Sequence, residues 1–136
     1  MNTRRNFLAA MVASALATAA GGALAAPPSV EIVAMPHPPV RVALAPLREW
    51  LAAQGGKLTV KEIDIESPLR EKRLVAAGLS GHIPILILID GKHVFVRKDG
   101  GKVAFVNFPN IPGTPPVARG EWTTADVQTV LAGRIR

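Results

Sequence analysis

The sequence predicts a single small α/β domain with a mixed sheet, preceded by an export segment. Strand-like and helix-like segments alternate over residues 29–89, and a hairpin and a last helix follow over residues 92–133. This order is typical of an α/β sandwich in which parallel and antiparallel strands share one sheet. A length of 136 residues leaves room for one hydrophobic core only.

The first half of the domain begins with a strand and a helix. Over residues 29–35, Val30 and Ile32 alternate with polar neighbours before the segment becomes fully apolar, as in a strand that enters a core. Three prolines within residues 36–39 end this strand, because proline cannot donate to a ladder. Apolar residues then recur at helical spacing over residues 40–54, and two glycines follow as in a helix C-cap.

A second strand and a second helix follow. Residues 58–65 alternate as a strand does, but the phase slips at residues 61–62, which predicts a bulge. A helix over residues 67–78 opens with Ser67 as the N-cap and Pro68 in the first helical position.

The third strand is the most hydrophobic part of the domain. Residues 83–89 form a continuous apolar run, which is the pattern of a strand buried on both faces. An Asp-Gly pair then predicts a hairpin turn into a strand over residues 92–97. There Val94 and Val96 share one face, and we expect His93, on the opposite phase, to face solvent.

The end of the chain adds a short strand, a loop and a helix. A glycine-containing turn leads to an extra strand over residues 102–108, and a proline-rich loop occupies residues 109–119. The last helix spans residues 123–133, where the hydroxyl of Thr123 can cap the helix while Asp126 reaches back.

Composition excludes several classes of function. The chain has no cysteine, which rules out disulfides, thiolate metal sites, iron–sulfur clusters and dithiol redox chemistry. Aromatic residues make up only 4%, which argues against a surface on which bases stack. The net charge of +6 falls to a mild +4 without the export segment described next, and because export makes such a partner unlikely we expect no nucleic-acid partner.

Residues 1–25 have the layout of an export signal. A basic start is followed by a long, alanine-rich uncharged stretch and by small residues that fit cleavage after Ala25. The mature domain would then be residues 26–136, and removal of Arg4 and Arg5 would lower the net charge from +6 to +4. We therefore expect a periplasmic protein that meets the membrane only through its signal segment.

The signal resembles the bacterial twin-arginine export motif. The resemblance lies in the adjacent Arg4 and Arg5 followed by Phe7 and Leu8, and in the weak hydrophobicity of the stretch after them. The general secretory route is the alternative. A second alternative is an uncleaved membrane anchor over residues 6–25, but alanine, serine, threonine and glycine contribute little insertion energy.

The domain resembles the thioredoxin-like family over most of residues 29–133. The motif that carries the resemblance is Gly-His-Ile-Pro followed by the apolar strand and an Asp-Gly turn. In the family, a cis peptide before such a proline opens the third strand, and Pro84 matches that proline. Pro46 matches a proline that kinks the family's first helix. The resemblance implies a three-layer sandwich around a mixed sheet.

The chain departs from the family at the redox site. Counting back from Pro46, the family's Cys-x-x-Cys falls on residues 38–41, where Pro38 and Arg41 stand in place of the two cysteines. The resemblance therefore implies the fold and the location of a site, but the family's redox activity is excluded. The extra strand and the proline-rich loop over residues 102–119 also differ from the minimal family pattern.

In such a fold, the turn after the first strand and the segment before Pro84 meet at one end of the sheet. We expect a binding edge there, at which the backbone beside the cis proline pairs with an extended segment of another protein. The residues expected to form this partner-binding site are His37, Pro38, Pro39, His82, Ile83 and Pro84.

Two other interpretations of the same residues stay open. His37 and His82, with Met35 nearby, could form a copper-type metal site, since two imidazoles and a thioether suit that metal. Alternatively, both histidines are ordinary loop residues that are exposed or hydrogen-bonded.

The sequence indicates no catalytic residues. Ser80 and His82 lack a nucleophile elbow around them, and Asp64 and Glu66 at a strand end are more typical of a solvated edge. We therefore expect a non-catalytic, cofactor-free binding or accessory protein whose partner is a protein or peptide segment in the periplasm.

Overall fold

The computed structural model describes residues 26–135 of the chain. The export motif of Arg4, Arg5, Phe7 and Leu8 and the cleavage after Ala25 lie outside the described residues. The elements follow the predicted order. They are β1 (Ser29–Ala34), α1 (Pro38–Ala53), the short 3-10 helix η1 (Gly55–Lys57), β2 (Thr59–Ile63), α2 (Pro68–Ala76), β3 (Ile85–Ile89), β4 (Val94–Val96), β5 (Lys102–Ala104) and α3 (Thr124–Ala132).

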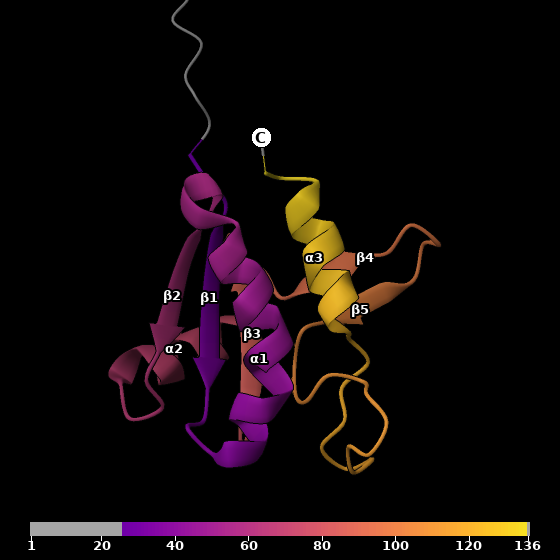
Figure 1. The fold of residues 1–136 in the computed structure, drawn as a ribbon. Coiled ribbons are helices and arrows are strands. Elements are labelled where there is room, and N and C mark those ends of the chain that lie inside the picture. The colour runs from indigo at the N-terminus through magenta and orange to yellow at the C-terminus, as the bar shows by residue number, and fades with distance from the viewer. Residues whose placement is uncertain (1–25, 136) are drawn as a thin grey trace, which may run out of the picture.

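The central sheet is mixed, as predicted, and has the order β2-β1-β3 (Figure 1). β1 is parallel to its neighbour β2 and antiparallel to its neighbour β3. The register between β1 and β2 runs unbroken to Ile63, so the predicted bulge at residues 61–62 is wrong. Ile63 caused the apparent slip, because it packs in the core on the α2 side of the sheet, whereas Leu58 packs in the core on the α1 side.

The chain returns to the sheet after the hairpin of β4 and β5. The N–H of Ile87 donates to the carbonyl of Phe105 at 3.0 Å, and the N–H of Asn107 donates to that of Ile85 at 2.9 Å. β3 is thus enclosed between β1 and residues 105–107, and all five of its residues are buried. This enclosure explains the continuous apolar run of the sequence.

The sheet separates two hydrophobic cores, which makes three layers. On one side, α1 and α3 pack on the sheet around residues such as Leu44 and Leu131 (Figure 1). On the other side, α2 packs through Leu74 on Leu86 and Leu88. In the described part of the chain, no helix is both long enough and apolar enough to span a bilayer.

The hairpin has the opposite phase to the predicted one. Val94 and Val96 are 46% and 65% exposed, whereas His93 and Phe95 are half-buried. Phe95 takes the inner face because its ring stacks on Phe105, with the centroids 5.1 Å apart. The prediction that His93 faces solvent is therefore wrong, and burial lowers the pKa of its imidazole.

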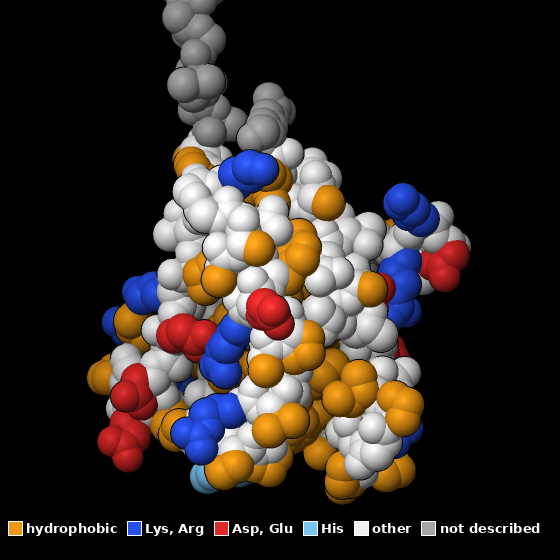
Figure 2. Space-filling view, viewed as in Figure 1, with side chains coloured by type: hydrophobic (Ala, Val, Ile, Leu, Met, Phe, Trp, Pro, Cys, Tyr) orange, Lys and Arg blue, Asp and Glu red, His pale blue; other side chains and the backbone are white. Residues whose placement is uncertain are grey.

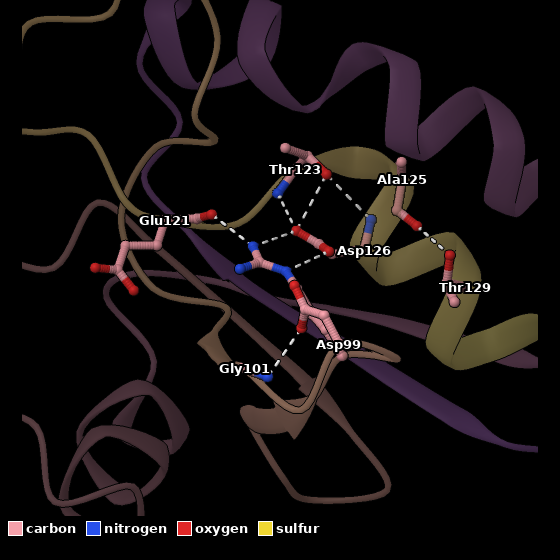
Figure 3. A network of polar contacts seen from close by, with 8 residues as sticks. Asp99, Gly101, Glu121, Thr123, Ala125, Asp126 and Thr129 are labelled. Atoms are coloured by element: carbon pink, nitrogen blue, oxygen red, sulfur yellow. Dashed lines mark hydrogen bonds and ion pairs between the residues drawn. The ribbon is translucent and has the colours of Figure 1, made fainter.

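A polar network joins this hairpin to the start of α3 (Figure 3). The predicted capping box is present, since the N–H of Asp126 donates to the hydroxyl of Thr123 at 3.2 Å and the Asp126 carboxylate accepts from the N–H of Thr123 at 2.9 Å. Arg97, which follows β4, donates to Asp126 at 2.9 Å and to the Glu121 carbonyl at 2.9 Å. The hydrogen bond from Arg97 holds the pKa of Asp126 below its usual value.

Candidate functional site

The turn after β1 lies directly beside the segment that enters β3. The N–H of Met35 donates to the carbonyl of Pro84 at 3.0 Å, one step beyond the last paired residues of the two strands, Ala34 and Ile85. The structure therefore brings the two predicted halves of the site to the same end of the sheet.

The predicted cis peptide before Pro84 is wrong, because every peptide bond in the described residues is trans. Pro84 is buried, and its carbonyl extends the antiparallel pairing of β3 with β1. The half-buried Ile83 packs against the core beneath α2. This strand start therefore supports the turn after β1, and the Pro84 carbonyl is already paired within the chain.

The prolines assigned to a loop instead start α1. Pro38 and Pro39 form its first turn, with His37 as the N-cap, so the helix begins two residues before the predicted start. Proline is compatible with the first helical turn, where its missing N–H is not needed. These two prolines remove two of the N–H groups that a helix start usually exposes, and the N–H of Arg41 already donates to the His37 carbonyl at 3.0 Å.

The two histidines and Met35 are not gathered around one point. His37 and His82 are both exposed, whereas Met35 is only 5% exposed and packs in the core beneath α1. Met35 could reach a metal at the surface only by leaving that core. Within residues 26–135, no group of three or more His, Cys, Asp or Glu side chains could hold a metal ion.

An apolar groove of about 610 Å³ lies at this end of the molecule, between α1 and the proline-rich loop. None of its lining residues is charged, and only one has a polar side chain. The α1 wall consists of Pro38, Pro39, Val42 and Ala43, and the loop wall of Phe108, Ile111, Pro112, Gly113, Thr114, Pro115 and Ala118. Figure 2 shows hydrophobic side chains gathered over both α1 and the neighbouring loop on this part of the surface.

The loop wall is held in place by its own backbone. The N–H of Phe108 donates to the carbonyl of Ala118 at 3.0 Å, and the N–H of Gly120 donates back to Phe108 at 2.7 Å. These bonds close residues 108–120 into a compact Ω-loop. Inside it, the Arg119 guanidinium donates to the carbonyl of Thr114.

The base of this Ω-loop is anchored in the core. Trp122 is fully buried, and its indole N–H donates to the carbonyl of Asn107 at 3.0 Å. Gly120 fits because it has no side chain, since a Cβ there would overlap the carbonyl oxygen of Val106 and lie 3.0 Å from that of Phe108. These contacts therefore give the Ω-loop a defined position as one wall of the groove.

Apolar side chains on and beside the groove are left in solvent. Val42 is 74% exposed, Ile111 is 42% exposed, and Val117 in the loop is 95% exposed. Contiguous apolar surface of this kind is typical of interaction sites, whereas single exposed apolar residues are common everywhere. The groove is therefore the best candidate for a binding site in this molecule.

One wall of this groove could be predicted from the sequence, and the other was not. Pro38 and Pro39 were among the predicted site residues, whereas residues 109–119 were assigned to a loop without a role. The signal that could have pointed to them is their composition, because this stretch has one charged residue, Arg119, and carries Ile111 and Val117 where surface loops are usually polar.

Two polar contacts that involve carboxylates stabilise the fold outside the groove. Arg73 on α2 donates to Glu31 on β1 at 2.8 Å, and this hydrogen bond lowers the pKa of the Glu31 carboxyl. Asp64 accepts from the N–H of Glu66 at 2.9 Å, which stabilises an exposed turn. Asp64 shares a hollow with Glu62, whose carboxylate is paired with Arg48 at 2.9 Å, and Glu66 is not among the residues that line it.

Comparisons of the chain with models of known protein families, with curated proteins and with solved structures found no match.

Proposed function

We propose that this chain is an exported, non-redox binding protein of thioredoxin-like topology, which engages a segment of another protein in the groove between α1 and the Ω-loop. The element order and the pairing of the strands support the topology. β1 lies between a parallel β2 and an antiparallel β3, and residues 105–107 continue the sheet beyond β3.

The groove is the observation that carries the proposal. It opens beside the first turn of α1, which is where the family resemblance puts the active-site loop. Its walls are apolar and uncharged, and Val42 and Val117 stand in solvent beside a loop that is already ordered. An ordered wall lowers the entropy lost when a partner binds, and apolar walls gain free energy when water leaves them.

The absence of cysteine from the chain supports binding rather than redox chemistry. Pro38 and Arg41 occupy the positions of the family's two thiols, and Pro38 lines the groove. The proposed activity is contact with a partner, and it requires no cofactor.

The path of the chain supports an accessible groove on the exported domain. Ala26, the first described residue, lies in a hollow with Gln54 and Lys57, beyond the C-terminal end of α1. The groove opens at the other end of this 16-residue helix, which is about 24 Å long at the usual rise per residue. Figure 1 shows the described chain starting at the end opposite the first turn of α1.

Site-specific photocrosslinking in the native periplasm tests this proposal. A photoreactive amino acid is placed at Val42 or at Val117, and a matched control is placed at Val75, which is 66% exposed on α2 in the opposite layer. We expect the two groove positions to crosslink one common protein, through one segment identified by mass spectrometry, and the control to leave it uncrosslinked. Adducts that are the same at all three positions would contradict the proposal.

A further inference from the structure

Carboxylates are absent from three of the segments at this end of the molecule, whereas the end of β2 and the turn after it carry Glu62, Asp64 and Glu66. The turn after β1 with the first half of α1, the entry to β3 and the Ω-loop comprise residues 35–48, 78–89 and 105–120, which contain no Asp or Glu. Their ionisable side chains are those of Arg41, Arg48, Arg119, His37 and His82. The lining of the groove is therefore apolar and uncharged, and the charged side chains of these three segments are all basic.

Of the three arginines in these segments, Arg41 is the one that is available to a partner protein. Arg48 pairs with Glu62 at 2.9 Å, and Arg119 is bonded to the Thr114 carbonyl. Arg41 precedes Val42 on α1, is exposed, and takes part in no ion pair within the described residues, although Glu62 and Asp64 line the same hollow on its β2 side.

The lining of the groove also restricts the backbone of the occupant. Pro38, Pro39, Pro112 and Pro115 have no N–H, so much of the lining cannot donate to a ligand's carbonyl groups. An extended segment needs such donors along its length, because its own backbone groups are unpaired. A helix pairs its backbone internally and can bury one apolar face without them.

We propose that the groove binds an amphipathic helix with acidic flanks, supplied by another protein. Its apolar face would pack on Val42 and the Ω-loop, and its carboxylates would lie near Arg41 and the positive end of the α1 dipole. This inference rests on the proposed function and names the chemistry of the partner. The nearest carboxylate along α1, Glu49, is two turns beyond Val42, and those of Glu62 and Asp64 lie in the hollow on the β2 side of Arg41, where Glu62 is paired with Arg48.

Three synthetic peptides test the inference on the purified protein by fluorescence anisotropy at low salt. They have about 18 residues, enough for a stable helix, and share one leucine-rich face. The first has glutamates on its flanks, the second has lysines there, and the third is the glutamate peptide with a central proline. We expect the glutamate peptide to bind about fivefold more tightly than the lysine peptide and about tenfold more tightly than the proline peptide.

Variants of the protein test whether the preference for the glutamate peptide over the lysine peptide arises at the groove. Arg41→Glu should remove the preference for glutamate, and Arg70→Glu on α2 should leave it unchanged. Val42→Glu should weaken the glutamate peptide by about tenfold or more, because the charge would be buried against an apolar face. Val75→Glu, a change at a similarly exposed valine outside the groove, should have no effect.

Each other outcome overturns a part of the inference. Equal binding of the glutamate and lysine peptides excludes the acidic flank, and equal binding of the proline peptide excludes the helix. A failure of the glutamate peptide to bind at millimolar concentration excludes both, while crosslinks at Val42 would still support the proposed function. If sedimentation shows a dimer that Val42→Glu dissolves, the groove belongs to a second copy of the chain and the inference is wrong.

Discussion

The two ends of α1 are built differently. Beyond its C-terminal end, Asp90 accepts from the N–H of Ser29 at 2.9 Å and pairs with Arg134 at 3.2 Å, which joins β1, β3 and the tail of α3. At its N-terminal end, backbone bonds order the Ω-loop, and the side chains that this loop and α1 present outward are apolar. One end uses polar side chains for cohesion, and the other leaves apolar side chains in solvent.

This contrast separates stability from binding. The core residues beneath α1 are completely or almost completely buried, so the fold already has its hydrophobic stabilisation without Val42 or Val117. Their exposure has a small cost in solubility and no evident benefit for folding. A change at the polar end should therefore alter stability without altering binding, and a change at the groove should do the reverse, except where it breaks the loop.

Gly120→Ala is expected to have the largest effect, because the new methyl group would overlap the carbonyl of Val106. We expect a loss of about 2 kcal/mol or more in the free energy of unfolding, measured in urea. Gly133→Ala is the matched control, since its Cβ would find only ordinary contacts, at 3.6 Å or more. An equal response of the two variants would show that the Ω-loop is not anchored as described.

Acid should destabilise the protein through Asp126 and Glu31. Arginine hydrogen bonds lower the pKa of both carboxyls in the folded state, so the unfolded chain binds protons at a higher pH than the folded one. The stabilisation is present above about pH 4, the usual range of these groups, and is lost as the pH falls through their lowered folded values. Between pH 7 and pH 3, the free energy of unfolding, measured in urea, should therefore fall by about 1 kcal/mol less for Asp126→Asn than for the wild type. An equal fall in the free energy of unfolding of the wild type and of Asp126→Asn would show that Asp126 does not contribute to the acid sensitivity.

Asp90→Ala tests the polar end of the molecule. The change removes the acceptor of the Ser29 N–H and the partner of Arg134, at a half-exposed site. We expect a loss of about 1 kcal/mol in the free energy of unfolding and unchanged affinity at the groove. Reduced binding by a variant that remains folded would show that the two ends are coupled.

The smallest expected effect is on copper binding, which we expect calorimetry to show as equal in the wild type and in a variant without His37 and His82. His37 and His82 are exposed, and the thioether of Met35 is buried in the core. The double variant His37→Ala with His82→Ala should therefore titrate as the wild type does. Stoichiometric uptake that only the wild type shows would instead favour a metal-binding function.

Local signals predicted the element order because each acts over a few residues. Ser67 caps α2 by accepting from the N–H of Leu69 at 3.2 Å, and Thr123 with Asp126 caps α3. The apolar run of β3 likewise predicted a strand covered on both faces. These features need no knowledge of distant contacts.

The features that the sequence analysis missed depend on long-range contacts. The Ω-loop owes its shape to the contact of Gly120 with Phe108 and to the bond from Trp122 to Asn107. The hairpin phase depends on the stacking of Phe95 on Phe105. None of these three contacts leaves a periodic signal in the chain, so the loop wall of the groove could not be predicted from hydrophobic spacing.

The central claim is tested most directly by the affinity of the segment that crosslinks at Val42, synthesised and titrated calorimetrically against three forms of the protein. We predict that Val42→Glu weakens its binding by about tenfold or more, whereas Val75→Glu binds it as the wild type does. Equal weakening by the two variants, or none by either, would contradict a binding site in this groove.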